Sequence, residues 1–556
     1  MSAHVEAVKH SGKTAGSPWR PFRHTSYTVI WTATVVSNVG YWMYSAASGW
    51  LMTSLDPSPL LVALVQVAAS LPMCVLALPA GALADIVERR KSLIIGELAV
   101  AVFSIVLAML VWIHFITPFS LLLLAVLIGS ATAMNTPAWQ AVVPQLVPKA
   151  ELAPAVSANS AGVNLSRAVG PALGGAIISL YGIAAPFWVN AISNFGVIGA
   201  LLWWREPKAH TSQLPPEHFG NAVRTGLRYA RNNASLGATL VRAAPFALFA
   251  SAYWALLPLV ARQQIAGGAE LYGMLLGAIG ASAVAGALVL PRLHSMFGSN
   301  DLVALGTLGT AVAMALFALA RTAVPAVIAS VIAGACWIAV LSSLNVSAQV
   351  ALPDWVRGRG LAMFVMVFYG GLTVGSAIWG QVASVIGLPF ALCIAAAGAL
   401  VSIPLTWRWK LGTGAALDLT PAMDGSTPLL TGDIEPDRGP VLVTTRYDID
   451  PKHREAFLST LGKLARERRR DGAYQWRTFE NPNCDGQFFE AYLTDSWLEF
   501  LRQHVRITKA DRPLLKAACR FQIHGAPKVT CLIAADTTKP NARRRSDSGA
   551  QHAGHP

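Results

Sequence analysis

Charged residues are scarce in this 556-residue sequence, at 13%, and hydrophobic residues make up 54% of it. That balance excludes a disordered chain. The six cysteines include no C-x-x-C pair and no Cys-His metal spacing, which predicts reduced thiols and neither a metal site nor another cofactor. Residues 1–26 are polar and basic and lack the short apolar core of a signal peptide.

The few charges are unevenly distributed along the chain. Residues 1–410 contain 33 of them, whereas residues 440–535 alone contain 27. Only the second segment has the charge density of an ordinary globular domain, about 25%. Residues 411–439 hold five acids and one base, which indicates an acidic linker, and residues 536–556 are predicted to be a disordered tail. We therefore expect an apolar region and a separate C-terminal domain.

The apolar region contains twelve hydrophobic runs, each long enough to cross a bilayer core of about 30 Å. Buried helices of a soluble protein would carry polar stripes, which almost none of these runs has. The sequence therefore predicts an all-α membrane protein with twelve transmembrane helices. We place these at 27–53, 60–84, 93–115, 119–141, 155–180, 184–204, 238–261, 271–291, 302–320, 323–346, 360–386 and 388–407.

Basic residues near the ends of the runs indicate the orientation. One set of loops carries many of them, including Arg89, Arg205 and Arg357, whereas the opposite loops carry only Arg262 and Arg321. We therefore expect both termini, the N-terminal segment 1–26 and the central loop 205–237 to be cytoplasmic. Much of the net charge of +14 is then explained by membrane orientation, without a nucleic-acid partner.

The two halves of the apolar region share an internal repeat at an offset of 209 residues. Gln140 matches Gln349, and Pro144 matches Pro353 in the same register. A duplicated six-helix unit in one orientation, here 27–204 and 238–410, is typical of secondary transporters that bind a small molecule near the bilayer midplane.

The loop after the second run has a glycine, an acid four residues later and then a basic cluster: Gly81, Asp85, Arg89 and Arg90. It resembles the signature loop of the major facilitator superfamily, although Ile86 and Glu88 depart from the usual pattern. The resemblance implies a latch between helices that breaks when the two halves rock. Gly81 would allow close helix approach, and Asp85 would bond to a neighbouring helix end. The alternative is an ordinary basic loop.

The fifth run carries a motif that resembles the Gly-Pro-x-x-Gly-Gly sequence of exporters in that superfamily, formed by Gly170, Pro171, Gly174 and Gly175. The resemblance implies export, and the small residues would let this run slide against a helix of the other half. Simple helix packing is the alternative. Arg167 precedes the motif, and a charge within a span is costly. It either forms a structural ion pair, with Asp85 as one candidate, or contacts an anionic substrate.

The same resemblance implies that the first, fourth, seventh and tenth runs line a cavity suited to an amphipathic aromatic molecule. The polar, aromatic and Met side chains available there are Asn38, Tyr41, Trp42, Ser45, Met134, Asn135, Arg242, Tyr253, Trp254, Trp337, Ser342 and Asn345. Glu97 is the one carboxylate within the runs. It either takes part in proton coupling, which the family implies, or snorkels to the membrane surface.

The C-terminal segment 440–535 alternates between strand and helix patterns. We predict strands at 441–447, 474–480, 487–493 and 528–533, and helices at 451–470 and 496–519. This βαββαβ order is that of a small α+β, ferredoxin-like plait.

The residues of this segment also carry a family resemblance. Gly472–Trp476, Glu490, Ser496–Arg506 and Asp511 resemble the appended domain of the bacterial transmembrane secretion effectors, a branch of the superfamily related to the enterobactin exporter. The plait itself resembles the antibiotic-biosynthesis monooxygenases, which dimerise through their sheets. The resemblance implies homodimerisation, gating or substrate presentation, with catalysis as the alternative. Candidate residues are Glu490, Trp497, Arg502, His504 and Arg506, and the last three are equally compatible with a solvated basic face.

Taken with these resemblances, the sequence predicts a secondary transporter of the bacterial cytoplasmic membrane that exports a siderophore, an antibiotic or a drug, with protons as a candidate coupling ion. Two alternatives stay open. One is a membrane-tethered enzyme whose plait modifies the exported compound, and the other is an importer of a metabolite or sugar.

Overall fold

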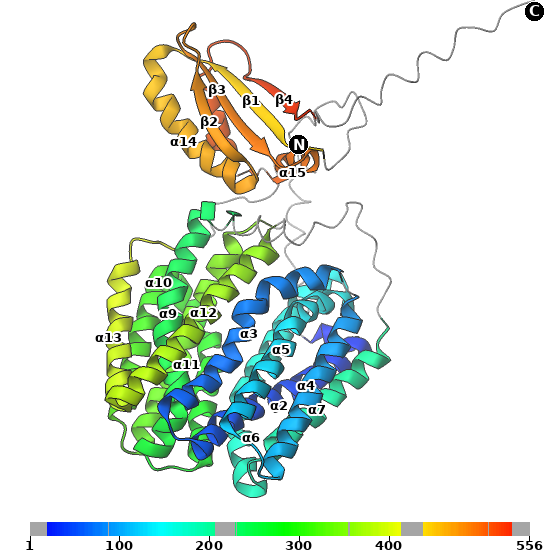
Figure 1. Cartoon of the computed structure of the whole chain (residues 1–556), viewed down its shortest axis with the longest axis vertical. Helices are drawn as coiled ribbons and strands as arrows, with labels where there is room; N and C mark the ends of the chain where they lie inside the picture. Colours follow the sequence, from blue (N-terminus) through cyan, green and yellow to red (C-terminus); the bar gives the residue numbers. More distant parts are fainter. Residues whose placement is uncertain are drawn as a thin grey trace, which may run out of the picture. The chain divides into compact units, whose positions relative to one another are not determined.

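The computed structural model describes residues 19–86, 88–205, 228–229, 231–353, 356–412, 438–506, 508–509 and 511–535. The chain divides into two compact units, Met1–Ala415 and Ala416–Pro556. We call them the membrane unit and the C-terminal domain, and describe each by itself (Figure 1).

The first half of the membrane unit is a bundle of six long helices. They are α2 (Thr25–Leu55), α3 (Pro59–Ile86), α4 (Arg89–Trp112), α5 (Pro118–Leu146), α6 (Leu152–Tyr181) and α7 (Ala185–Trp203), preceded by the short helix η1 (Arg20–Arg23) and interrupted by η2 (Lys149–Glu151). Thr117 and Ser120 form a reciprocal capping box at the start of α5.

The second half repeats this arrangement with five continuous helices. They are α9 (Ala234–Leu259), which continues into the π-helical turn η3 (Val260–Gln264), then α10 (Ala269–Leu319), α11 (Ala323–Val350), α12 (Arg357–Ile386) and α13 (Leu388–Thr406). Helix α10 holds two spans, because its backbone leaves the helical conformation at Gly298, with φ of 70°. Glycine adopts that conformation without the steric cost that other residues meet.

The twelve predicted spans are confirmed within the described residues. Ten helices are long and apolar enough to cross a membrane, and α10 counts for two spans. Helix α2 is less apolar but has 31 residues and no charged side chain. The predicted boundaries differ mainly where helices continue beyond their apolar run, as in α5, which ends at Leu146 rather than at residue 141.

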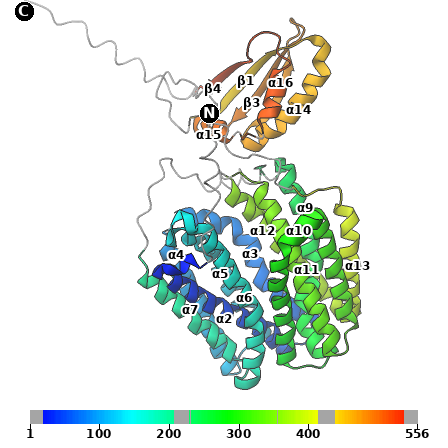
Figure 2. The ribbon, with the colours of Figure 1, turned by 180° about the vertical axis from the view of Figure 1, so that it is seen from behind.

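The two halves pack against each other mainly through two pairs of helices, α3 with α12 and α6 with α10, and to a smaller extent through α3 with α9. Figures 1 and 2 show the first half in blue and cyan and the second half in green and yellow. Helix α3 is the second span of its half, and α12 is the fifth span of the other half. Helix α6 is likewise the fifth span of the first half, and it packs on α10, which begins with the second span of the other half. This is the layout of two six-helix repeats that the offset of 209 residues predicts.

Helix α6 approaches its neighbours through the glycines of its motif. A Cβ at Gly170 would lie 2.9 Å from the carbonyl oxygen of Val39 on α2. A Cβ at Gly175 would lie 2.8 Å from the carbonyl oxygen of Ala269 on α10, in the other half. Gly174 packs on Met43. The predicted close contact between the fifth span and a helix of the opposite half is therefore present.

The C-terminal domain is a four-stranded antiparallel sheet in the order β2-β3-β1-β4. Its elements are β1 (Val441–Asp448), η4 (Pro451–His453), α14 (Arg454–Asp471), β2 (Tyr474–Glu480), β3 (Gln487–Thr494), α15 (Trp497–Arg506), α16 (Arg512–Cys519) and β4 (Lys528–Ile533). The four predicted strands and the antiparallel sheet are confirmed, with the helix α14 between β1 and β2 and helical residues between β3 and β4. The ferredoxin-like plait stays a prediction that this strand order is compatible with.

One predicted element of this domain is wrong. The single helix expected over 496–519 is two helices, α15 and α16. The backbone N–H and the hydroxyl of Thr508 both donate to Asp511, at 2.9 and 2.8 Å, and Pro513 then stands in the first turn of α16. Such local polar bonds compete with helix continuation, and proline fits well in the first turn of a new helix, where its missing N–H has no helical partner to bond.

Candidate functional site

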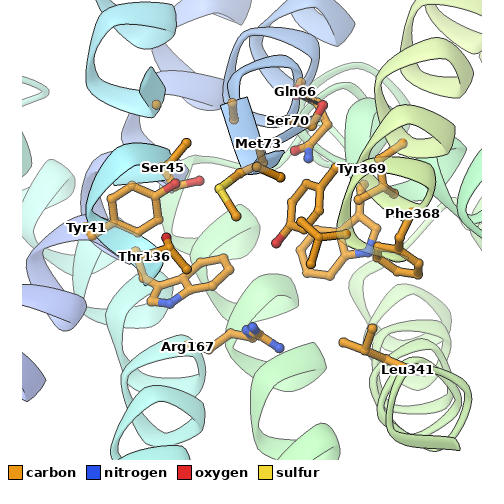
Figure 3. A pocket seen from close by; sticks show the side chains of 18 of the residues that line it. Tyr41, Ser45, Gln66, Ser70, Met73, Thr136, Arg167, Leu341, Phe368 and Tyr369 are labelled. Carbon is orange, nitrogen blue, oxygen red and sulfur yellow. Dashed lines mark hydrogen bonds between the residues drawn. The ribbon is translucent and has the colours of Figure 1, made fainter. Parts of the chain in front are cut away.

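A cavity of about 1770 Å³ lies between the two halves of the membrane unit. Its walls come from both halves, and Figure 3 shows side chains from them facing one space. The lining extends to Gly81, Val143 and Gly358, close to the helix ends that carry Arg89 and Arg357. We call this the basic end of the membrane unit, and the end that carries Arg262 and Arg321 the distal end.

Contacts between the halves close the distal end. Nη1 of Arg262 donates to Oγ1 of Thr53 at 2.9 Å and to Oγ of Ser54 at 2.6 Å. The guanidinium also lies over the ring of Trp50, which stacks on Tyr272 with 6.0 Å between ring centroids. The cavity therefore reaches the basic end and is sealed by polar and aromatic contacts at the distal end.

Among the described residues, two arginines line this cavity, Arg167 midway along α6 and Arg359 at the start of α12, near the basic end. The Arg167 side chain has few partners. Its guanidinium carbon lies 5.0 Å from the centroid of the Trp42 ring. Its Nε is buried and has no hydrogen-bond partner, and no ion pair to Arg167 occurs among the described residues. Tyr41 and Tyr369 lie close enough to interact with it electrostatically (Figure 3). The ion pair with Asp85 stays a prediction, because the side chain of Asp85 lies outside the described residues.

The second half contributes an aromatic wall to the cavity. Trp337 lies between Trp254 and Phe368, with ring centroids 5.3 and 5.6 Å away. Tyr369 follows Phe368 on α12, and all four side chains line the cavity. Aromatic pairs at these distances and tilts are favourable beyond the area that they bury.

The structure places only some of the predicted residues at the cavity wall. Those that line it are Tyr41, Trp42, Ser45, Arg167, Pro171, Trp254, Trp337 and Asn345. Those that do not are Asn38, Glu97, Met134, Asn135, Arg242, Tyr253 and Ser342. Tyr253 is buried behind Trp254 and stacks on Phe317, with 6.3 Å between ring centroids.

Arg242 lies outside the cavity and bonds to neighbouring helices of its own half. It is buried at the basic end between α9, α10 and α13, where Nη1 donates to Oδ1 of Asn300 at 3.1 Å. Its guanidinium also lies over Trp407. Expecting it in the cavity was wrong, because a long side chain can reach away from the face on which its backbone lies.

Glu97 does not snorkel, contrary to one of the two sequence expectations. It is buried between α4 and α5, where Asn135 donates to its Oε1 at 3.2 Å and Nε1 of Trp139 donates to the same atom at 3.1 Å. The two donors are neutral, so the site can hold the carboxyl group in either protonation state. It lies beside the cavity rather than in its wall.

The signature loop is only partly described. Gly81 lines the cavity, and a Cβ there would meet nothing within 4 Å, so the expectation of close helix approach at this residue is wrong. Arg90 donates to the carbonyl oxygens of Leu201 and Leu202, both at 2.7 Å, and thereby caps the end of α7. Arg89 starts α4 and is half-buried. The side chain of Asp85 lies outside the described residues.

Most of the cavity residues that were missed lie outside the four spans of the family expectation, whereas Thr136 and Gln140 were overlooked on one of those spans. The missed polar and aromatic ones include Gln66, Ser70, Thr136, Gln140, Asn159, Phe368 and Tyr369. The oxygens of Ser70 on α3 and Thr373 on α12 lie 2.8 Å apart and link the two halves. Gln66 and Ser70, four residues apart in an otherwise apolar helix, were the signal that could have found this wall.

In the C-terminal domain, Glu490 is fully buried and already has partners. Tyr447 donates to it at 3.3 Å, Arg468 at 3.4 Å and Nε1 of Trp476 at 2.9 Å. Burial, followed by the neighbouring carboxylate of Glu490, raises the pKa of Tyr447 above its usual range. The network ties the sheet to α14.

The expected solvated basic face on α15 is wrong for Arg506. That side chain is 4% exposed, and its guanidinium bonds to both carboxylate oxygens of Glu499 and to the carbonyl oxygen of Asp471. Arg502 lies 4.0 Å from Glu499. Trp497 is buried against Phe500 with ring centroids 5.1 Å apart. The side chain of His504 lies outside the described residues.

Comparisons with known proteins agree over most of the chain. A family model described as "Transmembrane secretion effector" matches residues 16–539. The staphyloferrin A transporter of Staphylococcus aureus is 24% identical over 268 residues, which cover 47% of this chain and 65% of that protein. The enterobactin exporter EntS of Shigella boydii serotype 4 is 24% identical over 359 residues, covering 64% of this chain and 85% of that protein.

Solved structures support the fold of the membrane unit. The nucleoside transporter NupG, as its D323A mutant, superposes with a TM-score of 0.58 at 12% identity, covering 69% of this chain and 99% of that one. A bacterial homologue of the human lysosomal transporter Spinster, solved inward-facing and unoccupied, gives a TM-score of 0.52 at 15% identity and covers 71% of this chain and 95% of that one. At these identities the likeness concerns the fold alone.

Proposed function

The chain belongs to the transmembrane secretion effector family of membrane transporters, and from this premise we propose that it exports a small amphipathic molecule by alternating access. Siderophores are the first class to test, because two relatives are named for transport of staphyloferrin A and enterobactin. The observation that carries the proposal is the cavity between the halves, which reaches the basic end while Arg262 closes the distal end.

The orientation follows from the distribution of bases. Arg89, Arg205 and Arg357 mark one end, so by the positive-inside rule the basic end faces the cytoplasm and both termini lie there. The structure then corresponds to a state that accepts substrate from the cytoplasm. Export requires the distal contacts to open and the basic end to close, by rocking of the two halves about α3, α6, α10 and α12.

Exchange for protons is the proposed source of energy, and Glu97 is its candidate carrier. The carboxyl group is buried and is held by two neutral donors on α5. Asn135 and Trp139 flank the cavity residue Thr136 on that helix, so a change in α5 on rocking would alter the bonds of Glu97. A buried acid whose surroundings change in this way can bind a proton in one state and release it in the other.

For the C-terminal domain we propose homodimerisation. The sheet face opposite the helices carries Leu442, whose cross-strand neighbours are Leu493 on β3 and Leu532 on β4. Leu532 and Phe479 are more than half exposed. An apolar sheet face of this kind is typical of an interaction surface.

Deleting residues 440–556 tests this role against the tethered-enzyme alternative. Dimerisation would be supported if the substrate leaves chemically unchanged and if light scattering shows two chains per particle for the full chain but one for the truncated chain. Conversion of a substrate by the full chain and loss of that conversion in the truncated chain would support an enzyme instead.

Transport itself is tested in membrane vesicles of opposite orientation, with enterobactin and staphyloferrin A supplied in parallel in the outside medium. Exporters fill inverted vesicles, whereas importers fill right-side-out ones. Uptake confined to right-side-out vesicles would establish the importer alternative and overturn export. Asp85→Asn is expected to lower uptake while membrane insertion stays intact.

A further inference from the structure

The cavity is chemically divided between the two halves of the membrane unit. The first half supplies a cation, Arg167, with Tyr41 and Trp42 beside it. The second half supplies the aromatic wall of Trp254, Trp337, Phe368 and Tyr369, and its own cavity arginine, Arg359, stands away from that wall at the basic end of α12. Figure 3 shows Arg167 and Tyr369 directed into the same space from opposite sides.

Arg167 occupies an unusual position for a cation. The face of its guanidinium is covered by Trp42, and its Nε is buried without a hydrogen-bond partner. Covering the face leaves the edge of the guanidinium, which carries the N–H donors, as the part that can bind a ligand. A cation shielded from water in this way gains strongly from a bidentate oxyanion such as a carboxylate.

The other arginines near the cavity differ from Arg167 in position or in partners. Arg242 donates to Asn300 and lies outside the cavity wall. Arg262 has Thr53 and Ser54 as partners at the distal end. Arg359 also lines the cavity, but it stands in the first turn of α12 at the basic end. Among the described cavity residues, Arg167 is therefore the arginine placed midway along its helix, and its buried Nε has no hydrogen-bond partner.

We infer that the substrates of this transporter are aromatic organic acids, held at both ends: their anionic group by Arg167 in the first half and their ring by Trp254, Trp337 and Phe368 in the second. The inference rests on the proposed function and names its substrate class. A ligand that bridges the halves also links binding to their relative movement, because each half holds one end of the same molecule.

Three small probes separate the two ends of the predicted substrate. 2-Naphthoate has the ring and the charge, 2-naphthylmethanol has the ring alone, and cyclohexanecarboxylate has the charge alone. Binding to the purified full-length protein is measured by equilibrium dialysis. We expect naphthoate to bind at least about 10-fold more tightly than either partial probe, as a charge-assisted hydrogen bond implies.

Substitutions assign each end to its half. Arg167→Gln should weaken naphthoate about 10-fold or more and leave naphthylmethanol unchanged, and Arg167→Lys should restore part of the loss. Trp254→Leu should weaken both naphthyl probes and spare cyclohexanecarboxylate. Arg242→Gln is the matched control, a buried arginine outside the cavity, and should leave the binding of all three probes at the wild-type value.

The inference is overturned if naphthoate does not bind saturably, if naphthylmethanol binds equally well, or if Arg167→Gln binds naphthoate like the wild type. Size-exclusion profiles identify any variant that fails to fold, in which case Arg167→Met, which also removes the charge, takes the place of Arg167→Gln with the same criteria. Vesicle transport separates the two proposals. Selective binding without export contradicts the proposed function alone, and export without selectivity for the anion contradicts this inference alone.

Discussion

Arg262 of the second half donates a hydrogen bond to Thr53 of the first half at 2.9 Å, across the distal end of the cavity. A second bond to Ser54 and the stacking of Trp50 on Tyr272 reinforce this contact. The chain therefore holds one end of its cavity shut with few polar bonds, which can be exchanged for water when the halves rock.

Arg262→Gln should favour opening of the distal end, because the bonds to Thr53 and Ser54 are lost from the closed state only. We expect a cysteine placed at Ser45 in the cavity, in a chain without native cysteines, to react several-fold faster with a membrane-impermeant maleimide added from the distal side. Arg321→Gln, an exposed base at the same end, is the control. Equal reaction rates in the two variants would show that Arg262 does not hold the gate.

Gly175→Ala should impair both stability and transport. The added Cβ would lie 2.8 Å from the carbonyl oxygen of Ala269, so α6 and α10 must separate, at a cost of about 1–3 kcal/mol. Gly81→Ala is the matched control, since a Cβ there meets nothing within 4 Å. Thermal unfolding in detergent should give a lower midpoint for the first variant only. A lowered midpoint for Gly81→Ala, or none for Gly175→Ala, would contradict the packing described.

Glu97→Gln should remove the response of transport to an imposed pH gradient while preserving the fold. The amide oxygen of glutamine can still accept from Asn135 and Trp139, but the side chain no longer binds a proton. Glu270→Gln, at an exposed position at the start of α10, should respond like the wild type. A full response in Glu97→Gln would exclude this residue as the proton carrier.

Glu467→Gln should stabilise the C-terminal domain at pH 8 but not at pH 4.5. Burial, and then the charge of Asp511, raise the pKa of Glu467 from 4.5 to about 7 in the folded domain. Between pH 4.5 and about pH 7, Glu467 keeps its proton in the folded domain and loses it in the unfolded chain. The free energy of unfolding of the wild type therefore falls as the pH rises through this range. Solvent reaches part of this side chain and weakens the effect, so we expect Glu467→Gln to raise the free energy of unfolding by about 1 kcal/mol at pH 8.

Urea unfolding of residues 438–535 measures this effect, because the domain is a compact unit with its own buried clusters. Glu455→Gln, an exposed position on the same helix, is the control and should change stability little at either pH. A gain for Glu467→Gln that is the same at pH 4.5 and pH 8 would show that titration is not its cause.

The sequence predicted the number of spans, their repeat and the four strands of the C-terminal sheet, because length, hydropathy and strand alternation encode them directly. It did not distinguish Arg167 from Arg242, although both are arginines within apolar helices. A helix surrounded by lipid and by other apolar helices is hydrophobic on every side, so its pattern does not show which face meets the cavity. For the same reason Gly81 and Gly175 look alike in sequence, and only the packed structure shows which of them a neighbour approaches.

The most direct test of export through this cavity is a comparison of inverted and right-side-out vesicles that contain the full-length protein, supplied with 2-naphthoate, enterobactin and staphyloferrin A under an imposed pH gradient. We predict accumulation of at least one compound in inverted vesicles, with loss of that accumulation when a bulky maleimide is attached at Ser45→Cys in the cavity wall. Accumulation only in right-side-out vesicles, or accumulation that persists with the cavity blocked, would contradict export by this route.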